Sequence, residues 1–253
     1  MKIQPWKINP TENALYCLIT GDSNSIHDFR QHREKTIVPG RLLESIGLEA
    51  YDFDSEPVHI RTELSSIVRV NDCVYYTHEK DGFVVDNNEK KGLNTKFVDN
   101  NPMKAKIQGV SILEYNTKDF HNVALLGSYI GSNVPITFLL GKSSHAIILY
   151  GQQDKIMNDL PESQVYMYGS IDTILMPSAF NVKQEGILHW KVKRISEDKI
   201  KFTPEILVEA YHNNTPIYKT RTRLSRIKKN GFSDDLTNQK FIKFCKSFSY
   251  AQF

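Results

Sequence analysis

The chain has 253 residues, of which 40% are hydrophobic and 24% are charged, an ordinary globular composition with room for one large domain or two small ones. A formal net charge of +3 favours no particular partner, and we expect no nucleic-acid partner. With no apolar run of membrane-spanning length and no signal-peptide h-region, we expect a cytoplasmic protein without a membrane span. Three cysteines without metal-ligand spacing fit a reducing compartment and indicate no disulfide framework: Cys17, Cys73 and Cys245.

The first predicted element is a helix with Pro10 near its start and Asn9 or Thr11 as its N-cap. We interpret Cys17, within this helix, as a core residue. The helix leads the chain into the loop that begins at Thr20. Apolar side chains at helical spacing form its predicted stripe: Ala14, Leu15, Leu18 and Ile19.

The loop after this helix carries a carboxylate, an amide and an imidazole close together, on Asp22, Asn24 and His27. An Asp/His pair that is not part of a Ser or Cys nucleophile arrangement indicates acid–base chemistry through a water. Asn24 would either orient that water or tie the loop to itself. The alternative is an ordinary turn, in which Asp22 and Asn24 bond their own backbone or Ser23 caps a helical turn.

A charged segment, residues 28–35, follows the loop, and we expect it to be solvated. Phosphate binding by Arg30 or Arg33 is the alternative. The chain then reaches Pro39-Gly40, which precedes the next helix.

The most apolar helix of the first half is predicted over Arg41–Phe53. Its first backbone N–H groups have no intrahelical partner, and the helix dipole is positive at that end. A thioester carbonyl docked there would be polarised, and the developing enolate would be stabilised. Gly40 has no side chain, so the carbonyl could approach closely.

The pattern Thr20-Gly21-Asp22-x-Asn24-x-Ile26-His27 resembles the T-G-D-x-N-P-I-H signature of MaoC-like, R-specific enoyl-CoA hydratases, which have the hot-dog fold. The resemblance, which covers residues 11–115 best, implies that Asp22 and His27 hold the water that adds to, or leaves from, the C2–C3 bond of an acyl thioester. It also implies that the Gly40 N–H binds the thioester oxygen, and we place Asn24 and Arg41 with Gly40 as substrate-binding residues. This chemistry needs no metal or redox cofactor.

The sequence departs from the family pattern at two positions. Ser25 replaces the usual Pro, which loosens the loop but removes no chemical group. Pro39-Gly40 replaces the family's His-Gly and is closer to the P-G of the related acyl-carrier-protein dehydratases, so the carrier is either CoA or a protein. Those dehydratases carry a catalytic Glu one position later than Glu44, and we therefore expect Glu44 to be a surface residue.

Strands dominate the rest of the first half, with turns at Asn71-Asp72 and Lys80-Asp81-Gly82. One apolar helix followed by consecutive strands indicates a helix wrapped by an antiparallel sheet. The predicted strands are Val58–Val70, Cys73–His78, Phe83–Asp86, Leu93–Val98 and Lys104–Glu114.

The second half repeats this order, with an apolar helix over Ile136–Gln153 and then strands. Asn100–Leu113 echoes Asn213–Arg226, which with the element order supports a duplicated unit. The second half has no Asp-x-Asn-x-x-His before its helix, and we interpret His145 within that helix as structural, with a pocket role as the alternative. The predicted strands are Gln164–Met176, Leu188–Ile195, Ile200–Tyr211 and Ile217–Ile227.

The last predicted strand presents Lys219, Arg221 and Arg223 on one face. We interpret this face as solvated, and a patch for CoA phosphates or an acidic carrier protein is the alternative. After a linker, Leu236–Phe248 is a basic amphipathic helix that we expect to pack on the domain.

We therefore expect an α+β protein with two tandem hot-dog units: residues 1–118 with the Asp/His motif, residues 119–230 without it, and a helical extension over 231–253. By resemblance, the chain dehydrates a 3-hydroxyacyl thioester or hydrates a trans-2-enoyl thioester, on CoA or an acyl carrier protein, with Asp22 and His27 catalytic. The rivals are a thioesterase and a non-catalytic acyl-thioester binder. The sequence leaves the oligomeric state open, a homodimer included.

Overall fold

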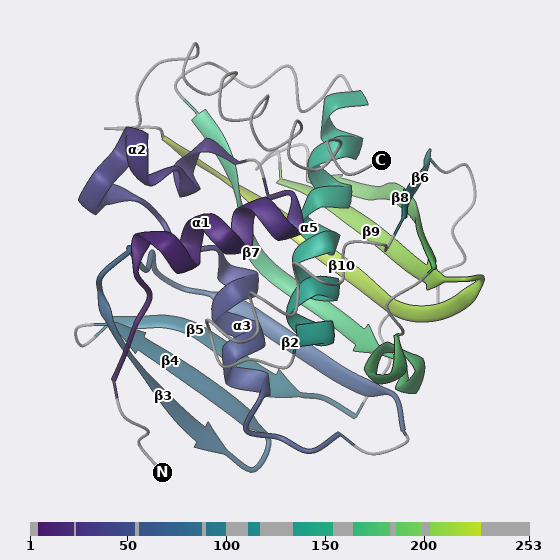
Figure 1. Ribbon diagram of the computed structural model, residues 1–253, viewed down its shortest axis with the longest axis horizontal. Coiled ribbons are helices and arrows are strands. Elements are labelled where there is room, and N and C mark those ends of the chain that lie inside the picture. Colours follow the sequence, from purple (N-terminus) through teal and green to yellow (C-terminus); the bar gives the residue numbers. More distant parts are fainter. Residues whose placement is uncertain are drawn as a thin grey trace.

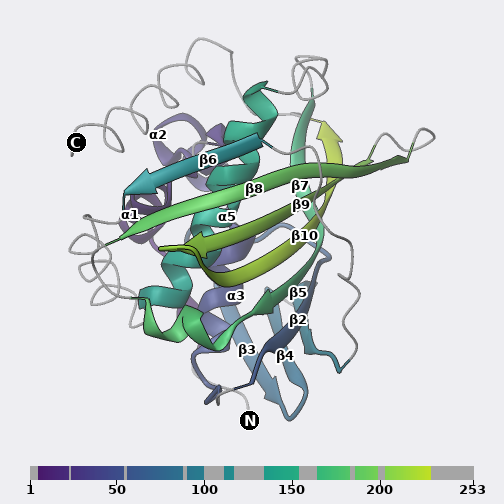
Figure 2. The ribbon, with the colours of Figure 1, turned by 90° about the vertical axis from the view of Figure 1, so that its right-hand side faces the viewer.

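A computed structural model describes residues 5–22, 24–53, 56–87, 90–99, 111–116, 134–153, 164–182, 186–198 and 203–228. These residues form one twisted ten-stranded sheet in which every paired strand is antiparallel to its neighbour (Figure 1). Figure 2 shows the sheet curling around the helices, which lie together on one of its faces. The core therefore lies between that face and the helices.

The first half of the chain supplies one side of the sheet and three helices. Short 3-10 turns at Ser25–His27 and Arg33–Lys35 flank the helix α2. The elements are β1 (Trp6–Lys7), α1 (Pro10–Thr20), α2 (Phe29–His32), α3 (Gly40–Leu48), β2 (Val58–Leu64), β3 (Cys73–Glu79), β4 (Gly82–Asn87) and β5 (Lys90–Phe97).

The second half supplies the other side of the sheet and one long helix. Asn213 and Asn214 both have positive φ, so the turn between the last two strands has the twist that suits a tight hairpin. The elements are β6 (Ser111–Asn116), α5 (Val134–Gln153), β7 (Gln164–Leu175), β8 (Ile187–Asp198), β9 (Thr203–His212) and β10 (Thr215–Lys228).

The strand order repeats about the centre of the sheet. One side reads β1-β3-β4-β5-β2 and the other reads, outward to inward, β6-β8-β9-β10-β7. In each half the helix lies between the first and second strand in sequence, α3 in one and α5 in the other. The halves meet where β2 pairs with β7, and α3 packs beside α5. The repeated order explains why the two halves of the sequence show the same succession of elements.

Three predicted boundaries are wrong. The helix predicted to reach Phe53 ends at Leu48, and the Tyr51 ring leaves the helix to pack edge-on against Phe97. The strand predicted over Val58–Val70 ends at Leu64, because the backbone farther along pairs with the segment before α3. The Val38 N–H donates to the Val68 carbonyl and the Val70 N–H to the Thr36 carbonyl.

The third boundary concerns β6. The strand predicted over Lys104–Glu114 continues to Asn116, and its described part, Ser111–Asn116, pairs with β8 in the second half of the sheet rather than with the strands that precede it. Its predicted start lies outside the described residues. Most of the Asn100–Leu113 echo and the predicted helix Leu236–Phe248 lie outside the described residues. Of the helices that the structure describes, none is long and apolar enough to span a membrane.

Candidate active site on the loop after α1

The helix α1 begins and ends with sequence-encoded caps. The Asn9 side chain accepts hydrogen bonds from the Thr11 and Glu12 N–H groups, and the Glu12 carboxylate accepts one from the Asn9 N–H. At the other end Gly21 has φ +76°, and its N–H donates to the Cys17 carbonyl. This left-handed glycine turns the chain out of the helix directly before Asp22.

The buried face of α1 is polar, which corrects the predicted stripe. Ala14 is exposed, and Leu15, Leu18 and Ile19 are only partly buried. The helix turns this way because its inner face joins the site and packs against α5. The fully buried residues of α1 repeat every three or four positions: Asn13, Tyr16, Cys17 and Thr20.

Asp22 and His27 lie together in the interior, with only 2% and 7% of their surfaces exposed. His27 Nε2 is 3.8 Å from Asp22 Oδ2, too far for a direct hydrogen bond. His27 Nδ1 is 2.6 Å from the Ile37 carbonyl oxygen. Because a carbonyl only accepts, Nδ1 carries the hydrogen and Nε2 of the neutral ring is an acceptor facing Asp22. One oxygen atom placed between the two side chains could bond to both.

The Asn24 side chain ties the loop to itself. Its Oδ1 accepts a hydrogen bond from the Ile26 N–H at 3.4 Å, and the backbone N–H of Asn24 donates to Asp22 Oδ1 at 3.3 Å. The turn bonds that the alternative interpretation predicts are therefore made, and the loop that makes them also brings the Asp22 carboxylate towards the His27 imidazole. The side chains of Ser23 and Ser25 lie outside the described residues.

Two further hydrogen bonds fix the backbone at His27. Asn13 Nδ2 of α1 donates to the His27 carbonyl at 2.8 Å, and the Ile37 N–H donates to the Ile26 carbonyl at 3.0 Å. The backbone at His27 is thus held by α1 on one side and by the segment that leads into α3 on the other.

The segment predicted to be solvated is partly buried. Asp28 and His32 are almost fully buried, and Asp28 caps α2 by accepting from the Arg30 N–H. The Arg30 guanidinium forms an ion pair with the same carboxylate at 3.1 Å. Arg30 is therefore engaged with the protein itself.

Gly40 opens α3 at a crowded position. A Cβ atom there would overlap a terminal methyl group of Leu64 on β2, so a side chain at this position would have to displace that methyl group. The carbonyl of Pro39 accepts from the N–H groups of Leu42 and Leu43, while the earlier N–H groups of the helix have no intrahelical acceptor. The start of α3 thus has the donors that the sequence analysis assigned to a thioester carbonyl.

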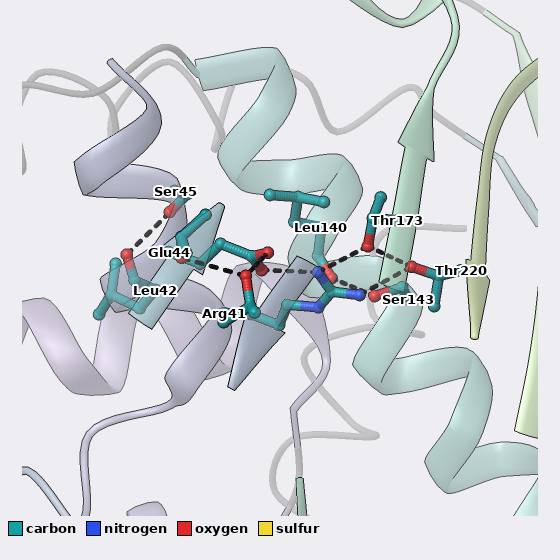
Figure 3. A network of polar contacts seen from close by, with 10 residues as sticks. Arg41, Leu42, Glu44, Ser45, Leu140, Ser143, Thr173 and Thr220 are labelled. Carbon is teal, nitrogen blue, oxygen red and sulfur yellow. Dashed lines mark hydrogen bonds and ion pairs between the residues drawn. The ribbon is translucent and has the colours of Figure 1, made fainter. Parts of the chain in front are cut away.

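Arg41 and Glu44 form a buried ion pair, at 2.6 Å, inside a polar network (Figure 3). The prediction that Glu44 lies on the surface is wrong, because its charge is matched by a guanidinium one helical turn earlier. The Arg41 guanidinium also donates to Thr173 of β7 and Thr220 of β10, at 3.1 and 2.8 Å. Thr62 of β2 donates to the other Glu44 oxygen at 2.7 Å. The network joins both halves of the sheet beneath the start of α3.

The second half of the chain reaches the loop through His145. Its Nδ1 lies 2.8 Å from the Gly21 carbonyl oxygen. This hydrogen bond gives His145 the structural role predicted for it and connects α5 to the residue directly before Asp22.

Sequence reasoning missed two tyrosines that lie close enough to Asp22 to feel its charge, Tyr16 from α1 and Tyr168 from β7. Burial, with the Asp22 charge as a second cause, raises the pKa of both hydroxyls far above the usual value, while the Arg41 guanidinium opposes the rise. Both phenols are therefore neutral hydrogen-bond donors at any ordinary pH. The signal available in the sequence was the spacing of Asn13, Tyr16 and Thr20, which puts three polar side chains on the helix face that leads to Asp22.

The basic residues of β10 are paired across the strands. Glu205 of β9 is buried and forms ion pairs with both Arg221 and Arg223, at 2.7 and 2.6 Å. Lys219 pairs with Glu209 at 2.8 Å. This neutralisation fits the solvated sheet face better than it fits a phosphate-binding patch.

No protein-family model matches the chain, and no curated protein matches it in sequence. A solved structure described as a MaoC-like dehydratase aligns over 89% of this chain and 96% of its own, with a TM-score of 0.54 and 8% identity. The chain has the hot-dog fold of the MaoC-like dehydratases. The family resemblance in residues 20–27 is thus confirmed at the level of the fold.

Two further solved structures align with most of this chain but with different shares of their own length. Full-length peroxisomal multifunctional enzyme type 2 from Drosophila melanogaster aligns over 89% of this chain but 48% of its own, with a TM-score of 0.54 and 9% identity. HtdX from Mycobacterium tuberculosis aligns over 90% of this chain and 99% of its own, with a TM-score of 0.47 and 10% identity. At these identities the likeness establishes the fold, and the chemistry has to be argued from the site itself.

No group of three or more His, Cys, Asp or Glu side chains within the described ranges could hold a metal ion. The groups that the described residues bring together here are the Asp22 carboxylate and the His27 imidazole, with the Tyr16 and Tyr168 phenols close enough to feel the Asp22 charge.

Proposed function

We propose that this protein interconverts 3-hydroxyacyl and trans-2-enoyl thioesters by removing or adding water, with Asp22 and His27 as the catalytic pair. The observation that carries the proposal is the 3.8 Å separation between two buried acceptors, Asp22 Oδ2 and His27 Nε2. Such a separation suits one water or one hydroxyl oxygen bonded to both side chains.

In the direction of hydration, the water oxygen forms a bond to C3 while one acceptor of the pair takes its proton. The π electrons of the C2–C3 bond move towards the thioester carbonyl, and C2 then receives a proton from the pair, so that the proton taken from the water is given back and the enzyme ends in its starting state. His27 Nε2 is a ready acceptor because its other ring nitrogen donates to the Ile37 carbonyl. Dehydration runs through the same steps in reverse.

The start of α3 supplies the second half of the proposed chemistry. The N–H groups at Gly40 and the positive end of the helix dipole would stabilise the enolate oxygen that forms as the C2–C3 electrons move. Arg41 contributes by holding this helix end against β7 and β10, as well as by its positive charge next to Gly40. Asn24 contributes by orienting Asp22.

We further propose that the sheet consists of two fused hot-dog units, each a five-stranded sheet around its own helix. The repeated strand order supports this arrangement. Because β6 occupies the same place in the second unit as β1 does in the first, we set the boundary before Ser111 rather than at residue 118. The first unit provides the acid–base pair, and the second provides His145 and Tyr168 around it.

The first experiment is to incubate the purified protein with a short trans-2-enoyl-CoA and follow the enoyl absorbance, with a thiol reagent in a parallel sample. Loss of the double bond without thiol release supports the proposal. Thiol release would instead assign the protein to the thioesterases, and tight binding without either reaction would make it an acyl-thioester binder.

The variants Asp22→Asn and His27→Gln test the pair. General acid–base catalysis typically contributes ~10²–10⁴-fold, so each variant should lose activity by about that factor. Asp172→Asn is the matched control, because that carboxylate pairs with Arg61 on the open side of the sheet, far from the motif in sequence. A folded Asp22→Asn protein with full activity would disprove the assignment.

A further inference from the structure

The buried face of α1 carries a hydroxyl without a hydrogen-bond partner among the described protein residues. Tyr16 is 0% exposed, and its Oη makes no hydrogen bond there. Other fully buried tyrosines are satisfied: Tyr76 Oη donates to the Leu43 carbonyl at 3.2 Å, and Tyr218 Oη accepts from Trp190 Nε1 at 2.8 Å. Tyr16 is thus an exception that calls for an explanation.

The hydroxyl lies where α1 meets α5. A Cβ atom at Gly141 would be 2.9 Å from Tyr16 Oη and would overlap the Thr20 side chain, so α5 comes this close only because residue 141 is glycine. The Asp22 carboxylate and the Arg41 guanidinium both act electrostatically on the Tyr16 hydroxyl. The hydroxyl is therefore close enough to Asp22 and Arg41 to feel their charges, at the place where α1 and α5 meet.

The needs of the proposed substrate match this position. An oxygen between Asp22 Oδ2 and His27 Nε2 faces two acceptors, which can take two hydrogens from a water. The water oxygen then has two lone pairs left, one to form the bond to C3 and one to accept a hydrogen bond from a donor. A neutral phenol without a hydrogen-bond partner among the described residues is a suitable donor.

We propose that Tyr16 is a substrate-binding residue of the Asp22–His27 site, and that its hydroxyl donates a hydrogen bond to the C3 oxygen of a 3-hydroxyacyl thioester or to the attacking water. This inference rests on the proposed function. It predicts that the site distinguishes acyl chains by the presence of an oxygen at C3.

The test compares two ligands in the Asp22→Asn background, where the 3-hydroxy ligand is not consumed. Binding of 3-hydroxybutyryl-CoA and of butyryl-CoA is measured by calorimetry, with and without Tyr16→Phe. We expect Tyr16→Phe to weaken the binding of 3-hydroxybutyryl-CoA by about tenfold, because one neutral hydrogen bond is lost, and to leave the binding of butyryl-CoA unchanged. Tyr76→Phe is the control, since it removes a buried hydroxyl that already bonds to the protein.

The melting temperature provides a second readout. Removing a hydroxyl without a partner should leave it unchanged or raise it, whereas a hydroxyl with a structural role would give a lower value. The inference is overturned if Tyr16→Phe melts at a lower temperature or fails to fold. It is also overturned if the substitution leaves the affinities for both ligands unchanged or weakens both equally. If the unmutated protein neither turns over a trans-2-enoyl-CoA nor binds either ligand, the proposed function itself fails, and that result is distinct from an active enzyme indifferent to Tyr16→Phe.

Discussion

His145 Nδ1 lies 2.8 Å from the carbonyl oxygen of Gly21, although the two residues belong to different halves of the chain. The half without the Asp/His motif thus contacts the motif directly. The contact holds the peptide unit that precedes Asp22, so it bears on the direction in which the carboxylate points.

We expect His145→Ala to lower activity by about tenfold or more while the fold persists, because the loop loses its anchor on α5 and small misplacements of reacting groups are costly. Steady-state kinetics with a trans-2-enoyl-CoA would measure this. His189→Ala is the control, since that ring stacks on Tyr211 in the second half of the sheet. Equal activity of both variants would show that the anchor has no effect on the site.

Gly21→Ala should destabilise the protein for two separable reasons. At φ +76° a Cβ atom costs about 1–2 kcal/mol, and here it would also overlap the His145 ring. Denaturant unfolding of Gly21→Ala, His145→Ala and the double variant separates the two terms. We expect the double variant to be more stable than the sum of the single losses predicts, and strict additivity would refute the steric part.

The Arg41–Glu44 pair should respond unequally to single and double replacement. Glu44→Gln or Arg41→Met leaves the other charge buried and unmatched, and we expect each to cost about 3–5 kcal/mol of unfolding free energy. Replacing both by apolar side chains of similar volume should recover most of that loss. Urea unfolding measures all three proteins, and a double variant as unstable as the sum of the single variants would contradict this account.

Glu49 predicts a pH dependence of stability. Burial raises its pKa in the folded protein from the ordinary 4.5 to about 7. The folded state therefore holds the proton more tightly than the unfolded state does, and this contribution to stability falls as the pH rises from about 4.5 to 7.

The variant that tests Glu49 is Glu49→Gln, which cannot ionise. Its melting temperature relative to the unmutated protein should increase between pH 4.5 and 7 and then level off. Glu63→Gln on β2 controls for the general loss of a negative charge. A constant difference over this range would show that Glu49 keeps an ordinary pKa.

The sequence predicted the strands well where apolar and polar residues alternate. Cys73–His78 was predicted and Cys73–Glu79 is observed, with the hairpin turn at Lys80-Asp81 as expected. It predicted less well where pairing is decided by distant residues. The end of β2 at Leu64 depends on backbone bonds to the segment before Gly40, and such bonds leave no periodic signal.

The proximity of Asp22 and His27 could be predicted from the sequence because their loop is local: six positions carry both residues and their turn bonds. Tyr168 and His145 approach from the second half, and their proximity follows from the sheet rather than from any spacing. The burial of Glu44 was foreseeable from Arg41 three positions earlier, since residues at this spacing face each other on a helix. The polar inner face of α1 was not predicted, because the leucines on either side of it suggested an apolar stripe and are themselves only partly buried.

The pairing of β2 with β7 has a consequence for how the chain reaches this structure. Val58 of β2 pairs with Leu175 of β7, far along the sequence. The pairs β3–β4, β4–β5 and β9–β10, in contrast, join strands that follow each other directly in the chain. Bringing β2 and β7 together closes the long stretch of chain between them, and the entropy of that closure is lost before any contact compensates for it. Non-local strand pairs of this kind therefore form late and slowly. We therefore expect each half of the sheet to assemble first and the β2–β7 seam to close last. On that pathway the Arg41 guanidinium meets Thr173 only in the final step, and the loop that carries Asp22 acquires its His145 anchor at the same time.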